Sequence, residues 1–249
     1  AFFAISGFVI CPTLKGGQYE GTRKFLISRF FRLFPAFWMS MVLILWTRHL
    51  WIVLAVDWQQ VLGNIPMLYS FFHVEPLQGL YWTLEVELIF YFLCLTLFLC
   101  GWLHKPLMLF FVGMVLMAAS QWILSRDEVV KEISAAFSIA WPQLPWNLAI
   151  MLWGGLFRIW YDDRKQTCSL GSCQIPVVAL VAALLFAILW RPLVLISDWV
   201  VQGKFDDLHY MVSYILGLGL FIVGALYIRL NNRFIVWLGT ISYSLYLLH

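Results

Sequence analysis

The sequence predicts an all-α protein, a polytopic bundle of about eight transmembrane helices. Hydrophobic residues make up 63% of its 249 residues and charged residues only 12%, about half the charge of an ordinary soluble domain. Apolar runs without Asp, Glu, Lys or Arg recur along the chain, and almost all charges lie in the gaps between them. Since lipid offers backbone groups no hydrogen-bond partners, each run that crosses the bilayer must be a helix.

The eight expected spans cover residues 1–14, 30–47, 82–102, 106–124, 144–160, 175–195, 210–228 and 234–249. No gap between them is long enough for a water-soluble domain, so residues 1–249 are expected to form one integral membrane domain. The stretch 48–81 is too apolar for a free loop and is expected to contain an interfacial or re-entrant segment.

Charge placement predicts how the bundle lies in the membrane. When the spans alternate in direction, 11 of the 16 Lys and Arg residues fall on one side, which is therefore expected to be cytoplasmic. The first span then runs inward, so at least one further span is expected before it. The chain also opens without an initiator Met and stops inside an apolar run, so we expect the domain to be partial. The net charge of +3 gives no reason to expect a nucleic-acid partner.

Two polar clusters lie in the first part of the chain. Ser6 and Gly7 form a small pair that permits close helix approach, and a substrate contact is the alternative interpretation. Arg29 and Arg32 lie three residues apart on one helix face at the cytoplasmic mouth of a span. Their guanidinium groups suit phosphate or carboxylate, and anchoring to anionic lipid headgroups is the alternative.

A third cluster opens the span at 82–102. Glu85 and Glu87 point in nearly opposite directions on a helix, about 200° apart, whereas Glu87 and Tyr91 share a face. A carboxylate inside a span costs about 2.5–3.5 kcal/mol, so Glu87 is expected to face the bundle interior. Glu85 is expected to reach the outer surface. A purely structural, hydrogen-bonded glutamate is the alternative for Glu87.

The remaining polar groups are less specific. Near the end of the chain, Ser242 and Tyr246 share a helix face, as do Tyr246 and His249, and hydrogen bonding between helices is the simple interpretation. Cys168 and Cys173 lie in a polar gap without a histidine, so no metal site is expected there.

Taken together, the clusters resemble the acyltransferase-3 family of integral membrane acyltransferases, which includes O-antigen and exopolysaccharide O-acetylases. The first motif is a Phe-rich Ser-Gly-Phe stretch, here Phe2-Phe3-Ala4-Ile5-Ser6-Gly7-Phe8. The second is Arg-x-x-Arg followed by Pro, here Arg29, Arg32 and Pro35. The third is matched by Trp82, Thr83, Leu84, Glu87, Phe90 and Tyr91, with Thr in place of the usual Ser. The fourth is matched by Ser242, Tyr243, Tyr246, Leu247 and His249.

The resemblance implies transfer of an acyl group, most often acetyl, from a cytoplasmic acyl-CoA to a hydroxyl of a cell-surface or lipid-linked carbohydrate. It implies an integral protein of the bacterial inner membrane, surrounded by membrane lipids, with acetyl-CoA or another acyl-CoA as co-substrate and no cofactor. Arg29 and Arg32 would bind the acyl donor, and Glu87 would act in catalysis. The acceptor cavity would be lined by Ser6, Trp82, Tyr91, Ser242, Tyr243 and His249.

In one respect the chain departs from the family pattern, and this leaves the predicted site without a catalytic base. The family's catalytic histidine belongs to an earlier helix, about eleven positions after a basic residue, and is expected upstream of residue 1. We assign that role to no histidine within residues 1–249. A lipid-linked sugar transporter, or an inactive fragment lacking the catalytic helix, are therefore the alternatives.

Overall fold

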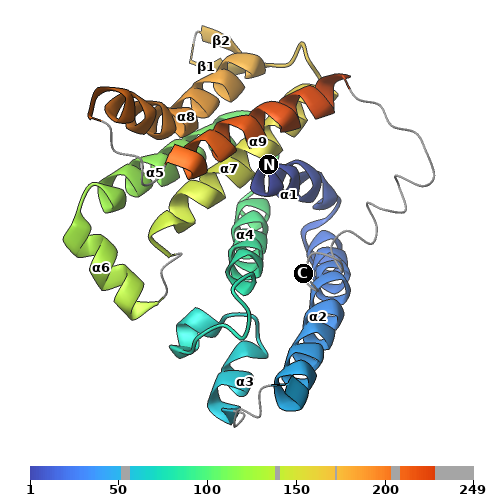
Figure 1. Cartoon of the computed structure of the whole chain (residues 1–249). Helices are drawn as coiled ribbons and strands as arrows, with labels where there is room; N and C mark the ends of the chain where they lie inside the picture. The colour runs from blue at the N-terminus through green and yellow to red at the C-terminus, as the bar shows by residue number, and fades with distance from the viewer. Residues whose placement is uncertain (52–56, 138–140, 172, 203–207, 228–249) are drawn as a thin grey trace.

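The computed structural model describes residues 1–51, 57–137, 141–171, 173–202 and 208–227. Nearly all of this part is helical (Figure 1). The helices are α1 (Phe2–Ile10), α2 (Gln18–Trp51), α3 (Trp58–Asn64), α4 (Tyr81–Leu99), α5 (Pro106–Leu124), α6 (Asp127–Ala136), α7 (Leu144–Asp162), α8 (Val177–Gln202) and α9 (Leu208–Tyr227). Three short 3₁₀ turns, η1 (Cys11–Thr13), η2 (Tyr69–Phe72) and η3 (Trp141–Gln143), and one hairpin, β1 (Thr167–Leu170) and β2 (Cys173–Pro176), complete it.

The predicted helical membrane bundle is confirmed. In the described part, four helices are long and apolar enough to cross a membrane, at Gln18–Thr47, Tyr81–Leu99, Pro106–Leu124 and Val177–Val194. Two shorter apolar helical stretches, Phe2–Thr13 and Val212–Tyr227, accompany them. The span expected at 234–249 lies outside the described residues.

Helix bounds follow the prediction where a strong local signal is present. α5 begins at Pro106, as expected, because proline suits the first turn of a helix. α1 ends at Ile10 rather than at residue 14, because Pro12 lies in the 3₁₀ turn that follows. α2 begins at Gln18 rather than at residue 30, and its 34 residues are about 51 Å long. Its basic first turns therefore extend beyond the hydrocarbon core, which is about 30 Å thick.

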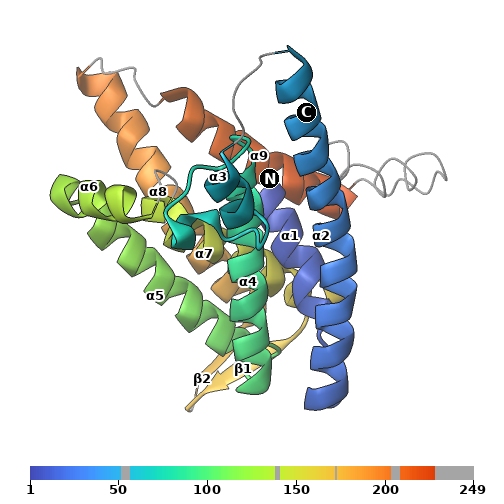
Figure 2. The same ribbon diagram turned by 90° about the horizontal axis from the view of Figure 1, so that it is seen from below.

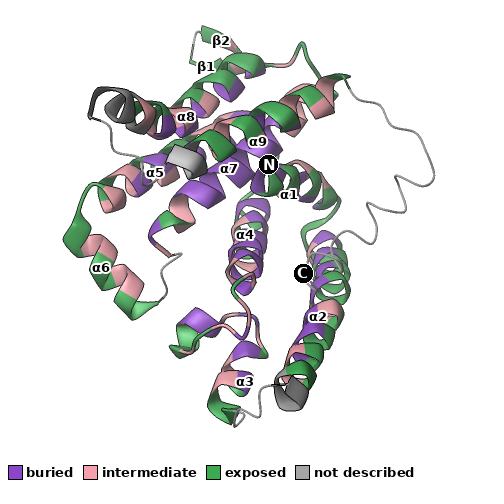
Figure 3. Cartoon of the chain, in the orientation of Figure 1, coloured by how far each residue is buried: buried purple, intermediate pink, exposed green. Residues whose placement is uncertain are grey.

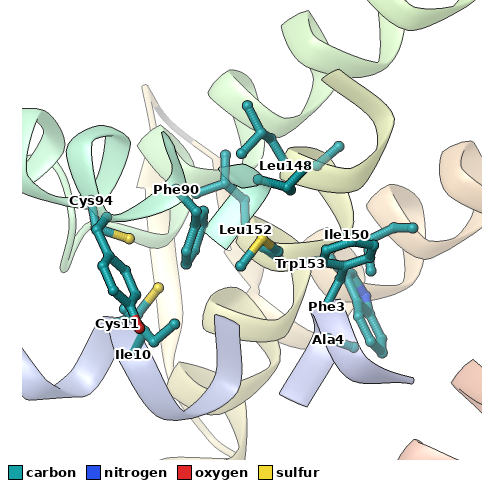
Figure 4. Close-up of a cluster of buried hydrophobic side chains, with 14 of the residues drawn as sticks. Phe3, Ala4, Ile10, Cys11, Phe90, Cys94, Leu148, Ile150, Leu152 and Trp153 are labelled. Atoms are coloured by element: carbon teal, nitrogen blue, oxygen red, sulfur yellow. The ribbon is translucent and has the colours of Figure 1, made fainter. Parts of the chain in front are cut away.

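The centre of the bundle is α7. It packs against α1, α5, α8 and α4, and every residue from Trp146 to Phe157 is buried. Burial is concentrated on α7 and α4, while α2 and α6 have long exposed stretches (Figure 3). Side chains from α1, α4 and α7 meet in the core, including Phe3, Phe90 and Trp153 (Figure 4). A helix that is apolar all round is typical of such a central position.

Glycines bring α1 and α7 into backbone contact. A methyl group added at Gly7 would overlap the Met151 carbonyl, and one at Gly154 would overlap the Ala4 carbonyl. Such small-residue interfaces are typical of close helix pairs in membranes. The structure thus supports helix packing as the role of Gly7.

The hairpin was not expected from the sequence, which predicted helices alone. β1 pairs antiparallel with β2, with Leu170 opposite Cys173. Gly171 has a φ of +61°, a conformation that short hairpin turns require and that glycine adopts without strain. The prediction missed the hairpin because it was based on long apolar runs, and this stretch lies in a polar gap.

The stretch between α2 and α4 contains a short helix, α3, and then folds back toward α4. Asn64 holds this fold, since its Nδ2 donates to the carbonyl oxygens of Gln60 (2.8 Å) and Glu75 (3.0 Å). Its Oδ1 accepts from the Leu77 backbone amide at 3.3 Å. Residues 58–77 are therefore an ordered part of the bundle rather than a free loop.

Candidate functional site

Glu87 and Tyr91 form a buried hydrogen-bonded pair on α4. The Tyr91 hydroxyl donates to Oε1 of Glu87 at 2.6 Å. Glu87 is only 3% exposed, as expected for a carboxylate that faces the bundle interior. Residues four apart lie one above the other on a helix, and this places the hydroxyl beside the carboxylate.

Arg29 of α2 joins this pair from the neighbouring helix. It is 6% exposed, and its guanidinium carbon lies 5.5 Å from the Tyr91 ring centroid and 5.3 Å from that of Phe25. These are cation–π distances. Both Arg29 and Arg32 are close enough to Glu87 for favourable charge interaction. The buried carboxylate therefore has compensating positive charge, without which burying it would be very costly.

Thr13 holds Arg29 in place. An Nη nitrogen of Arg29 donates to Thr13 Oγ1 at 2.8 Å, and the Thr13 hydroxyl donates to the Ile10 carbonyl at 2.6 Å. The turn η1 is thereby linked to α2 and, through Arg29, to α4. Arg29 Nε is buried and has no hydrogen-bond partner within the described residues, so one N–H donor of the cluster is free.

The arginine motif divides into a buried and an exposed member. Arg29 is buried in the cluster, whereas Arg32 is exposed. From their spacing, Arg29 and Arg32 were predicted to share one helix face and to bind the acyl donor together. The structure places Arg29 in contact with the cluster and leaves Arg32 at its edge, where it acts through its charge.

Trp82 lies at the contact between α1 and α4. The Trp82 ring is half-buried and lies 5.9 Å from the ring of Phe3. Ser6, one turn further along α1, is also half-buried. Ser242, Tyr243 and His249 lie outside the described residues, so their place in the cavity stays a prediction.

Glu85 is buried, and the expectation that it reaches the outer surface is wrong. It is 2% exposed and accepts hydrogen bonds from the Ser70 backbone amide at 3.2 Å and the Ser70 hydroxyl at 2.7 Å. The Trp141 side chain is a further hydrogen-bonding partner. Glu85 therefore fastens η2 and η3 to the start of α4. The sequence gave no sign of this, because Ser70 lies in a stretch without a periodic pattern.

A cavity of about 300 Å³ lies between α2 and α4, next to the cluster. Arg29 and Tyr91 contribute to its wall, and the rest of the lining is apolar. We call it the α2–α4 groove; the sequence analysis did not predict it. Figure 2 shows α2 beside α4 at the edge of the bundle.

Two histidines have side chains that the structure describes, and neither contacts Glu87, Tyr91 or Arg29. His104 packs its ring against Phe98, and His73 ends η2 with a φ of +53°. Within the described part of the chain, no group of three or more His, Cys, Asp or Glu side chains could hold a metal ion.

The cluster offers two kinds of chemistry. The Glu87 carboxylate can accept a hydrogen bond from a hydroxyl or an imidazole N–H, and Arg29 Nε can donate one to a carbonyl or phosphate oxygen. Both act in a buried site, where electrostatic interactions are stronger than in water. This pairing of an acceptor and a cationic donor is suited to polarising a carbonyl beside a hydroxyl nucleophile.

Comparison with known proteins gives one match. The acyltransferase-3 family model, described as an acyltransferase domain, matches residues 1–249. No curated protein and no solved structure matches the chain.

Proposed function

Because the chain belongs to the acyltransferase-3 family, we propose that it transfers an acyl group, expected to be acetyl, from a cytoplasmic acyl-CoA to a hydroxyl of a cell-surface carbohydrate. The family match makes it an acyltransferase, and the four apolar helices make it a membrane protein. The donor, the acceptor and the bacterial inner membrane are our proposal.

The observation that carries this proposal is the buried cluster of Glu87, Tyr91 and Arg29. A carboxylate held by a tyrosine and flanked by arginines inside a membrane bundle is costly to maintain, and such groups usually serve function. Each belongs to a motif through which the chain resembles the family.

The proposed reaction needs a base for the acceptor hydroxyl. The hydroxyl oxygen attacks the thioester carbonyl carbon, the C–S bond breaks, and the hydroxyl proton passes through the base to the departing thiolate of coenzyme A. The base expected from the family is a histidine outside residues 1–249, and Glu87 is suited to orient it or to accept a hydrogen bond from the acceptor.

Arg29 and Arg32 are proposed to hold the acyl donor. Coenzyme A carries phosphates, and guanidinium groups bind phosphate through paired N–H donors. Arg29 Nε is a buried donor with no partner in the described part, so it is available to a ligand. Arg32 is exposed and can meet the donor before it reaches the buried cluster.

The acceptor is proposed to bind on the side of the cluster away from the acyl donor. Trp82 offers an indole face for a sugar ring, and Ser6 offers a hydroxyl on the adjoining helix. Ser242, Tyr243 and His249 are proposed to complete this cavity.

Membranes from cells that express the full-length protein test this function. We expect thiol release from acetyl-CoA above the rate of membranes without the protein, and mass spectrometry of surface glycans should show an added mass of one acetyl group. Thiol release without glycan modification would contradict the carbohydrate acceptor. An absence of thiol release with every acyl-CoA would contradict the donor.

A further inference from the structure

We propose that the α2–α4 groove binds an acyl chain of an anionic membrane phospholipid, with the lipid phosphate held at Arg23. The groove borders the proposed acyl-transfer site, since Arg29 and Tyr91 contribute to the walls of both, but the lipid is neither the acyl donor nor the acceptor of the proposed reaction. The proposal is based on the lining of the groove, on its exposure and on the charge at its end.

Apart from Arg29 and Tyr91, the side chains that line the groove are apolar. Leu26, Phe30 and Leu33 of α2 face Leu88 and Leu95 of α4 across it. A cavity of 150 Å³ holds a benzene molecule, so 300 Å³ holds roughly a dozen carbon atoms. The α2 wall runs from Phe25 to Phe34, a rise of about 14 Å. The groove therefore has the length and the volume for about two thirds of a phospholipid acyl chain of ~16–18 carbons.

The groove opens sideways on helices that cross the membrane. Leu26 is 45% exposed, Phe30 42% and Phe92 53%. All three lie within candidate spans. Large exposed apolar side chains on a span face the lipid, so a bilayer chain enters the groove without leaving hydrocarbon. A chain that arrives on a water-soluble thioester has no such direct route.

A basic residue follows the groove toward the start of α2. Arg23 lies three residues before Leu26 and seven before Phe30, so the three share one helix face. Arg23 is exposed and forms no ion pair within the described part of the chain. Tyr19, on the same face and 80% exposed, suits the headgroup region, where tyrosines gather. The phosphate of a lipid at this end of the groove would contact Arg23 while the acyl chain of the same lipid lies along the groove.

The occupant is tested with the purified full-length protein in nanodiscs of phosphatidylcholine and phosphatidylglycerol. Native mass spectrometry then counts the lipids that each variant retains. We expect the wild type to retain phosphatidylglycerol in preference. L95W, which fills the groove, should reduce this retention at least fivefold. R23Q should abolish the preference for phosphatidylglycerol while chain binding continues.

Matched controls separate the groove from the general lipid surface. V115W adds the same bulk to an exposed position on α5, and K131Q removes a charge from α6; both should retain lipid like the wild type. Equal retention of the two lipids by the wild type, or unchanged retention in both L95W and R23Q, would overturn the proposal. The proposal would also be overturned if L95W lost binding of decanoyl-CoA but retained phosphatidylglycerol like the wild type. The chain of the acyl donor would then be the occupant of the groove.

Discussion

Arg29 donates a hydrogen bond to the hydroxyl of Thr13, 2.8 Å away, and this contact ties the turn after α1 to the helix that carries the arginine motif. The guanidinium is thereby fixed against the Tyr91 ring and near Glu87. Three segments of the chain thus meet at one polar cluster, of which Arg29, Glu87 and Tyr91 are buried and Thr13 is exposed. The orientation of Arg29 depends on a residue outside every motif that the sequence presented.

Replacing Thr13 tests this dependence. T13V removes the hydroxyl that accepts from Arg29 while keeping the shape of the side chain, and a hydrogen bond to a charged group contributes about 1.5–3 kcal/mol. We expect the KM for acyl-CoA to rise about tenfold, with kcat changed less. T13S keeps the hydroxyl and should behave like the wild type. A T13V enzyme with the wild-type KM would show that Arg29 needs no support from η1.

Replacing Arg29 tests the proposed donor site. R29A should lower acyl-CoA affinity at least tenfold, measured by isothermal titration in detergent. R29K should not restore it, because an ammonium lacks the planar fork of donors. R126A removes an arginine that stacks on Trp122 at another surface and serves as the control. Unchanged acyl-CoA affinity in R29A would remove Arg29 from the donor site.

The glycine contact between α1 and α7 predicts a stability effect. G7A places a methyl group against the Met151 carbonyl, and overpacking of this kind costs about 1–3 kcal/mol. We expect a lower Tm for the detergent-solubilised protein. G224A adds a methyl group where no atom lies within 4 Å and should leave Tm near the wild-type value. Equal Tm values for the two variants would argue against the close approach of α1 and α7.

The Glu85–Ser70 contact predicts a local effect. S70A removes the hydroxyl that donates to Glu85, and we expect faster hydrogen exchange in the segment 65–80. S125A, at an exposed hydroxyl after α5, should leave exchange there unchanged. Protection of 65–80 that is the same in S70A and the wild type would mean that other contacts hold this segment.

The sequence predicted those features that depend on spacing along one helix. Pro106 marked the start of α5, and the four-residue spacing of Glu87 and Tyr91 indicated a shared face. Contacts between segments could not be predicted from the sequence. Thr13 meets Arg29 only because η1 turns the chain back, and no periodic pattern encodes that turn.

Other missed features have the same cause. Glu85 looked solvent-accessible because its partner Ser70 comes from a stretch without helical spacing. The α2–α4 groove arises from the distance between two helices, which composition does not determine. Arg29 and Arg32 looked equivalent by spacing, yet packing against α4 buries one and leaves the other exposed.

The central claim is that the buried Glu87 carboxylate is required for acyl transfer, and turnover of E87Q measures it most directly. E87Q keeps the size of the side chain and its capacity to accept from Tyr91 while removing the charge. We predict a fall in kcat of at least 100-fold, at wild-type expression and Tm, whereas E128Q at an exposed position on α6 retains full activity. An E87Q enzyme that transfers the acyl group at the wild-type rate would contradict this account.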